Sequence, residues 1–223
     1  MRVLVTGILG FIGSNLAEKL VANGYDVYGV IRRVANRNMN VIENIIGDVT
    51  LISGDITDYV STRNAIKTAN PDVVVHLAAL SPVRDSFERP FEYQQTNFVG
   101  TMNVAHSLLE LPDSNKRKLI AASTAEVYGI QKNEPLKETL PLHPSSPYAV
   151  SKAAGDIYLQ MPTGRECPRE DGYFSPDDGQ PPCQPMVGGL SRERLGLRCA
   201  RARSGPCTKR CTRAPRAPYI MKR

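Results

Sequence analysis

The 223-residue chain lacks any long apolar run. A membrane-spanning helix needs roughly 20 consecutive apolar residues, and no stretch of this sequence approaches that length. We therefore expect no membrane partner. Because Met1 leads directly into a strand-like segment, we also expect no signal peptide, and both absences favour a cytoplasmic protein.

Cysteine is absent from residues 1–160, and all five cysteines lie in residues 161–223. Charge is divided in the same way. The first part has 15 Lys and Arg against 16 Asp and Glu, whereas the second part has 13 against 6. The excess of positive charge therefore characterises the second part alone.

The second part has two features that invite a ligand. Residues 192–216 are rich in arginine, which attracts nucleic acid electrostatically, but no aromatic residue is interleaved there. Cys207 and Cys211 are spaced as potential zinc ligands, but no Cys-x-x-Cys pair or following histidine accompanies them. We expect neither a nucleic-acid partner nor a metal.

Strand-like and helical segments alternate through residues 1–160. We expect strands at Arg2–Thr6, Asp26–Ile31, Val49–Ser53, Asp72–Leu77 and Lys118–Ala122, and helices near 14–23, 58–68, 91–110 and 148–160. Alternation of this kind predicts a parallel sheet with helices on both faces. The fold class is therefore α/β, a Rossmann-type doubly wound sheet formed by residues 1–160.

The alternation stops near Gln160. Residues 161–223 are rich in Pro, Gly and Arg and have few large aliphatic side chains. Such a segment buries too little apolar surface to offset the entropy of ordering it. We expect an irregular tail that is not a domain, and a sheet that ends after about its fifth strand.

A glycine-rich turn follows the first expected strand. Gly7 permits a tight turn, Gly10 lets the backbone approach a pyrophosphate, and Gly13 lets the next helix pack closely on the strand. Phe11 and Ile12 lie within the turn, where free N–H groups face the phosphates. This arrangement predicts binding of a dinucleotide.

The end of the second strand bears on the choice of dinucleotide. An NAD site usually has Asp or Glu there to bind the ribose 2′-hydroxyl, but this chain has Arg32 and Arg33. Because arginine provides a charged, bidentate fork, the pair suits the 2′-phosphate of NADP. NADP is the predicted cofactor, with NAD as the alternative and solvated arginines as the other interpretation.

Two later segments complete the predicted cofactor site. Asp55 and Ile56 can meet the adenine, although Asp55 equally suits a turn. Leu77, Ala78 and Ala79 are small or apolar residues whose backbone can lie against the ribose and phosphates. The preceding residue, His76, is expected to lie inside the fold rather than to act as a catalytic residue.

An acid–base set follows. Tyr148 and Lys152 are four residues apart, so a helix places them on one face. A nearby ammonium favours the phenolate and makes tyrosine usable for proton transfer. Thr124 and Glu126 follow the fifth strand, at the sheet edge where ligands of open α/β folds bind.

In combination these segments resemble the extended short-chain dehydrogenase/reductase family, which includes nucleotide-sugar epimerases and dehydratases. The matching pieces are Thr6-Gly7-x-x-Gly10-x-x-Gly13, Gly54-Asp55-Ile56, His76-Leu77-Ala78-Ala79, Asn97-x-x-Gly100-Thr101-x-Asn103, Ser123-Thr124-x-Glu126-Val127-Tyr128-Gly129 and Pro147-Tyr148-x-x-x-Lys152. They span about seven tenths of the chain. Members of this family are commonly homodimers and act on a nucleotide sugar.

The resemblance also implies roles. Tyr148 is the base at the sugar 4-hydroxyl and contacts the cofactor together with Lys152, and Thr124 binds the same hydroxyl. Ser81 and Ser123 are expected at the substrate. Glu126 is typical of 4,6-dehydratases and decarboxylases rather than 4-epimerases, and Arg32 with Arg33 is similar to the GDP-mannose 4,6-dehydratase branch. Phe11 and Ile12 are instead commoner in epimerases and other dehydratases.

The similarity ends near Gln160, where the family would add a sixth strand and a substrate-binding lobe. A disrupted reading frame near that residue would explain the change in composition. Three interpretations therefore remain open. They are an NADP-dependent 4,6-dehydratase, an NAD-dependent epimerase or decarboxylase, and an inactive dinucleotide-binding fragment.

Overall fold

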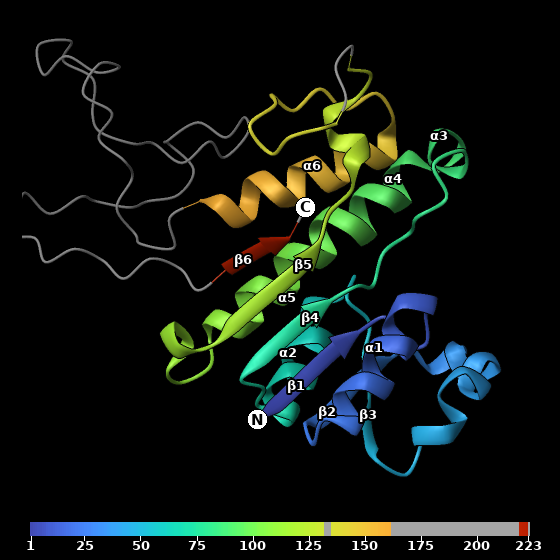
Figure 1. Cartoon of the computed structure of the whole chain (residues 1–223), viewed down its shortest axis with the longest axis vertical. Coiled ribbons are helices and arrows are strands. Elements are labelled where there is room, and N and C mark those ends of the chain that lie inside the picture. The colour runs from blue at the N-terminus through green and yellow to red at the C-terminus, as the bar shows by residue number, and fades with distance from the viewer. Residues whose placement is uncertain (132–134, 162–218, 223) are drawn as a thin grey trace, which may run out of the picture. The chain divides into compact units, whose positions relative to one another are not determined.

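The computed structural model describes residues 1–131, 135–161 and 219–222 (Figure 1). Its centre is a six-stranded sheet in the order β3-β2-β1-β4-β5-β6, with every neighbouring pair parallel. The strands are β1 (Arg2–Thr6), β2 (Asp26–Ile31), β3 (Val49–Ser53), β4 (Val73–His76), β5 (Lys118–Ala122) and β6 (Tyr219–Lys222). The chain reverses its direction of winding between β3 and β4, which opens a crevice at the strand ends beside β1.

Alternate residues of the strands pack into two apolar cores. Leu4, Val74 and Leu119 belong to one buried cluster, whereas Val3 and Val5 belong to another. Successive side chains of a strand point to opposite faces, so a strand buried on both faces needs an unbroken apolar run. The runs of β1 and β4 meet this need.

Helices cover both faces. They are α1 (Phe11–Ala22), η1 (Arg33–Ile45), α2 (Tyr59–Ala69), α3 (Asp85–Glu88), α4 (Pro90–Tyr93), η2 (Gln94–Val99), α5 (Gly100–Leu109), η3 (Ser114–Lys116), η4 (Ala125–Tyr128) and α6 (Pro147–Gln160). Ala17 of α1 and Ile42 of η1 complete one core. Ile66 of α2, Val104 of α5 and Leu159 of α6 complete the other.

The predicted Rossmann-type fold is confirmed, and the five expected strands are present within one residue at each end. The helix expected over 91–110 is divided. A π-helical stretch, η2, joins α4 to α5 and carries Asn97 into the interior. The 3₁₀ helix η1 was not expected, although its apolar residues recur at a helical spacing.

The expectation of no strand after residue 160 is wrong at Tyr219–Lys222. These residues form β6 and pair in parallel with Leu119–Ala122 of β5. The strand is only four residues long and follows a proline-rich stretch, so no local sequence pattern predicts it. The rest of the expected tail, including Cys207 and Cys211, lies outside the described residues.

No helix among the described residues is long and apolar enough to cross a membrane.

Candidate cofactor and active site

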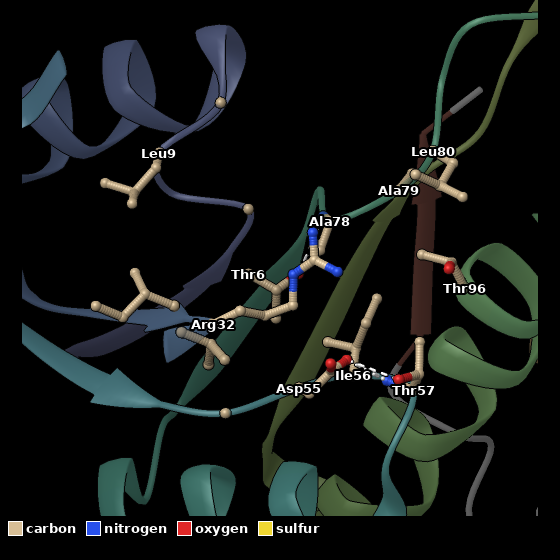
Figure 2. A pocket seen from close by; sticks show the side chains of 15 residues that line it. Thr6, Leu9, Arg32, Asp55, Ile56, Thr57, Ala78, Ala79, Leu80 and Thr96 are labelled. Atoms are coloured by element: carbon tan, nitrogen blue, oxygen red, sulfur yellow. Dashed lines mark hydrogen bonds between the residues drawn. The ribbon is translucent and has the colours of Figure 1, made fainter. Parts of the chain in front are cut away.

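A pocket lies at the carboxyl ends of the strands around β1 (Figure 2). Its lining residues are Thr6, Gly7, Leu9, Gly10, Val30, Ile31, Arg32, Gly54, Asp55, Ile56, Thr57, Ala78, Ala79, Leu80 and Thr96. Its volume of about 190 Å³ is below the range of roughly 300–1,000 Å³ usual for a drug-sized ligand. The pocket can therefore enclose only part of a dinucleotide.

The glycine turn leaves no room for side chains where it meets its neighbours. Gly7 has a φ of +73°, and a Cβ there would lie 2.8 Å from the backbone nitrogen of Ala78. A Cβ on Gly13 would lie 2.1 Å from the carbonyl oxygen of Gly7. Both positions require glycine, because the backbone of the turn packs directly on α1 and on the loop that follows β4 (residues 77–84, the β4 loop).

Helix α1 begins without a side-chain cap. Its N-cap is Gly10, and its first turn contains no acidic residue. By contrast, Asp58 caps α2 and Ser146 caps α6 with a side-chain oxygen. An uncapped helix start leaves N–H groups for an external acceptor, and the positive end of the helix dipole favours an anion there. The turn thus suits a pyrophosphate.

Arg32 and Asp55 occupy the end of the pocket beside β2 and β3. The Arg32 side chain, which is exposed, points into the pocket, and Asp55 lies below it (Figure 2). One carboxylate oxygen of Asp55 accepts hydrogen bonds from the backbone N–H and the hydroxyl of Thr57, at 2.9 and 2.8 Å. Asp55 therefore forms the turn that the sequence allowed, while Arg32 offers its donors to a ligand.

Helix α6 carries the predicted base. Ser146 accepts a hydrogen bond from the backbone of Ala149 at 3.1 Å, and Pro147 occupies the first turn, so the helix begins immediately before Tyr148. Tyr148 is half-buried and makes an edge contact with the buried ring of Tyr93, with 6.3 Å between ring centroids. The phenol is thereby held in place rather than free in solvent.

Lys152 lies one helical turn beyond Tyr148 and is buried. Burial lowers the pKa of its ammonium, and the carboxylate of Asp156 opposes this shift. Asp156 is itself buried and accepts a hydrogen bond from the Ser123 hydroxyl. Burial of the Lys152 ammonium near the Asp156 carboxylate strengthens the electrostatic interaction between these two groups, because the local dielectric is low.

The segment after β5 meets α6. Val127 and Tyr128 of η4 pack on Ala153 of α6, which brings the end of β5 beside the Tyr148–Lys152 turn. Thr124 caps η4 by accepting the N–H of Glu126 at 3.3 Å, so its hydroxyl proton can be donated to a ligand. The Glu126 side chain is exposed at this edge.

The predicted residues divide between the pocket and its surroundings. Gly7, Gly10, Arg32, Asp55, Ile56, Ala78 and Ala79 line the pocket, whereas Phe11, Ile12, Gly13, Leu77, Ser81, Ser123, Thr124, Glu126, Tyr148 and Lys152 do not. Phe11 and Ile12 are exposed, and Gly13 lies inside α1. Arg33 begins η1, and its side chain is not among those that the structure describes.

Sequence reasoning missed part of the lining. The lining residues that were not predicted as cofactor contacts are Thr6, Leu9, Val30, Ile31, Gly54, Thr57, Leu80 and Thr96. Thr57 and Leu80 directly follow predicted contacts in the sequence, so a wider window around each motif would have found them. Thr96 comes from η2, and no local signal indicates it.

His76 lies where it was expected, inside the fold, with 3% of its surface exposed. Burial is the main cause that lowers its pKa from 6.5 to about 3, and the charge of Lys152 lowers it further. The unfolded chain therefore binds a proton on this histidine between pH 6.5 and pH 3 that the folded chain does not.

Stability is expected to fall as pH decreases from 6.5 towards 3, by up to about 1.4 kcal/mol per pH unit from His76 alone. The measurement is urea unfolding across this range for the unmodified chain and for His76→Phe, which lacks the titrating group. The slope should be shallower in the variant. Equal slopes would mean that His76 does not titrate differently in the folded and unfolded chains.

Comparison with known proteins extends these observations. Residues 4–161 match the family described as GDP-mannose 4,6 dehydratase. A GDP-mannose 4,6-dehydratase of Vibrio cholerae is 37% identical over 158 residues, covering 68% of this chain and 42% of the relative. A UDP-glucose 4-epimerase of Mycolicibacterium smegmatis is 36% identical over 164 residues, covering 72% of this chain and 51% of the relative.

Solved structures of epimerases are similar as well. The UDP-glucose 4-epimerase of Thermus thermophilus in complex with NAD has a TM-score of 0.62 and 35% identity, with 71% of this chain and 50% of that chain covered. That of Thermotoga maritima with UDP-glucose has a TM-score of 0.63 and 32% identity, at the same coverage of 71% and 50%. The chain spans about two fifths of the length of the dehydratases it matches.

Proposed function

Because the chain belongs to the GDP-mannose 4,6-dehydratase family over residues 4–161, we propose that this part binds NADP and carries the acid–base set of a nucleotide-sugar 4,6-dehydratase. The observation that carries the proposal is Glu126. It stands exposed at the carboxyl end of β5, on a segment that packs against the helix of Tyr148 and Lys152. A carboxylate there can serve an elimination that an epimerase does not perform.

The residues present fit a nicotinamide dinucleotide. The glycine turn has no space for side chains, and the uncapped start of α1 faces outward for a pyrophosphate. The nicotinamide, when bound, supplies transient oxidation of the sugar by accepting and returning a hydride. The contribution of this chain is to bind the dinucleotide, to place the sugar beside it and to move protons.

We assign those proton movements as follows. Tyr148 takes the proton of the sugar 4-hydroxyl, and Lys152 lies one helical turn further along α6. Thr124 donates a hydrogen bond to the same oxygen. Glu126 then removes the proton at C5 and passes it to the 6-hydroxyl, which leaves as water. Tyr148 returns its own proton to C5 when the hydride returns to C6.

Arg32 supports NADP over NAD, because its guanidinium lies in the pocket where an NAD site would have an acid. We expect NADPH to bind the chain at least about tenfold more tightly than NADH. Arg32→Ala should abolish that preference and leave NADH affinity within about twofold. The measurement is fluorescence titration with each dinucleotide. Equal affinity of the unmodified chain for NADPH and NADH would contradict the proposal that NADP is the cofactor.

The main alternative is a 4-epimerase that uses NAD. It is favoured by the similar solved structures, among which the Thermus enzyme is described as a complex with NAD. A decarboxylase is the next alternative, since Glu126 would suit it as well. The homodimer implied by the resemblance, and the expectation of no nucleic-acid partner, stay predictions.

One experiment separates these reactions. Residues 1–160 are joined to the carboxyl-terminal half of a GDP-mannose 4,6-dehydratase, and the protein is incubated with a panel of nucleotide sugars. Product masses are then measured. Loss of one water supports the dehydratase, an isomer of unchanged mass supports the epimerase, and loss of carbon dioxide supports the decarboxylase.

A further inference from the structure

A chain of buried hydrogen bonds passes behind the pocket, and none of the roles assigned so far uses it. The Thr6 hydroxyl lies 2.7 Å from Nδ1 of His76, and Nε2 of His76 lies 3.1 Å from the Thr101 hydroxyl. The Thr101 hydroxyl donates in turn to the carbonyl oxygen of Asn97 at 2.6 Å. All four residues are at most 5% exposed.

The hydrogen bonds of Thr6 and Thr101 determine which ring nitrogen of His76 carries the proton. The Thr6 hydroxyl oxygen accepts the backbone N–H groups of Leu77 and Ala78, each at 3.2 Å. The Leu77 N–H is shared with the Thr6 carbonyl oxygen, also at 3.2 Å. At the other end, the Thr101 hydroxyl gives its only proton to the Asn97 carbonyl, so it can only accept a hydrogen bond from Nε2 of His76. Nδ1 is then an acceptor, and the ring proton lies on Nε2, where it is donated to Thr101.

We propose that His76 is a positioning residue of the dinucleotide site. In its neutral Nε2–H tautomer, His76 orients the Thr6 hydroxyl, and the oxygen of that hydroxyl holds the β4 loop against the glycine turn. The inference rests on the proposed function, since it concerns how the same site is held in shape. His76 acts through Thr6 and Ala78, both of which line the pocket. A Cβ on Gly7 would lie 2.8 Å from the Ala78 nitrogen, so the glycine turn packs closely on that loop.

At its other end, this series of hydrogen bonds reaches α6, the helix that carries the predicted base Tyr148. The Asn97 amide holds Leu80, which also lines the pocket, by accepting its N–H at 2.8 Å and donating to its carbonyl at 2.9 Å. The same amide donates to the Ser151 hydroxyl at 3.0 Å. Ser151 bonds the Tyr148 carbonyl at 2.7 Å, so one connected set of bonds spans both halves of the site.

Burial supports the neutral state of His76, because burial and, to a smaller extent, the charge of Lys152 lower its pKa to about 3. If Nδ1 carried a proton instead, it would be directed at the Thr6 oxygen, whose lone pairs are already occupied. Thr6 would then have to release an amide of the β4 loop. The tautomer and the shape of the pocket are therefore linked.

The direct test is the ¹⁵N spectrum of the imidazoles in the full chain, which distinguishes the two tautomers and the charged form. The chain has three histidines, and the exposed His106 and His143 can be replaced by Gln to leave one signal. We expect the neutral Nε2–H form, unchanged between pH 8 and pH 5. An Nδ1–H or a charged ring would overturn the inference without requiring any change to His76.

Variants of Thr101 test the consequence for the site. Thr101→Val removes the acceptor of the Nε2 proton at constant shape, and we expect a change of tautomer with NADPH affinity reduced about fivefold to tenfold. Thr101→Ser should restore both. Ser107→Ala is the matched control, since Ser107 is a buried α5 hydroxyl that bonds the carbonyl four residues earlier, at Asn103.

The outcomes separate the two proposals. An unmodified chain that binds no dinucleotide would refute the proposed function and the inference with it. A chain that binds NADPH, and whose Thr101→Val variant folds and binds within about twofold of normal, would overturn the inference alone. A Ser107→Ala loss equal to that of Thr101→Val would overturn it as well, because any buried hydroxyl would then have the same effect.

Discussion

Tyr148→Phe is expected to reduce turnover of a nucleotide sugar by about 10²-fold to 10⁴-fold, with little change in fold. The phenol oxygen is the only part removed, and the ring keeps its edge contact with Tyr93. The measurement is single-turnover kinetics in the chimera of residues 1–160 with a dehydratase carboxyl-terminal half. The transient absorbance of reduced nicotinamide reports the first hydride transfer.

Glu126→Gln should separate the steps in the same assay. The amide keeps the shape of the exposed side chain but cannot accept the C5 proton, so oxidation at C4 continues while water loss nearly stops. Reduced nicotinamide should therefore accumulate. Tyr25→Phe, an exposed tyrosine beside β2, is the control and should change neither step. If Glu126→Gln slowed both steps equally, Glu126 would not be the elimination base.

Gly13→Ala is expected to weaken NADPH binding by about tenfold to a hundredfold and to destabilise the chain by roughly 1–3 kcal/mol. The added Cβ would lie 2.1 Å from the Gly7 carbonyl and 2.8 Å from the Cα of Ile8, both of them backbone atoms. Neither atom can rotate away as a side chain could, so α1 must move away from β1. Its N–H groups would then move away from the predicted phosphate site. Fluorescence titration and urea unfolding measure the two effects.

Gly47→Ala is the matched control for that experiment. A Cβ at Gly47 has nothing within 4 Å, so affinity should be unchanged and stability nearly so. A Gly13→Ala chain that bound NADPH normally would show that the close packing of α1 on the glycine turn does not shape the site.

Much of the fold could be predicted from the sequence, because its signals are local. The apolar runs of β1 and β4 required burial on both faces, and the glycine spacing required a turn that packs on a helix. The Tyr148–Lys152 spacing placed both side chains on one helical face. These features depend on backbone geometry within a few residues, which the sequence expresses directly.

The chain's sequence by itself thus determined a parallel sheet, a glycine turn without room for side chains, and the order of the acid–base segments. The tertiary structure alone decided the contacts between distant segments. It paired Ser123 with Asp156, placed Thr96 in the pocket and added β6 beside β5. It also joined His76 to Thr101, 25 residues away, because hydrogen bonds between elements depend on how helices pack on the sheet rather than on any local pattern.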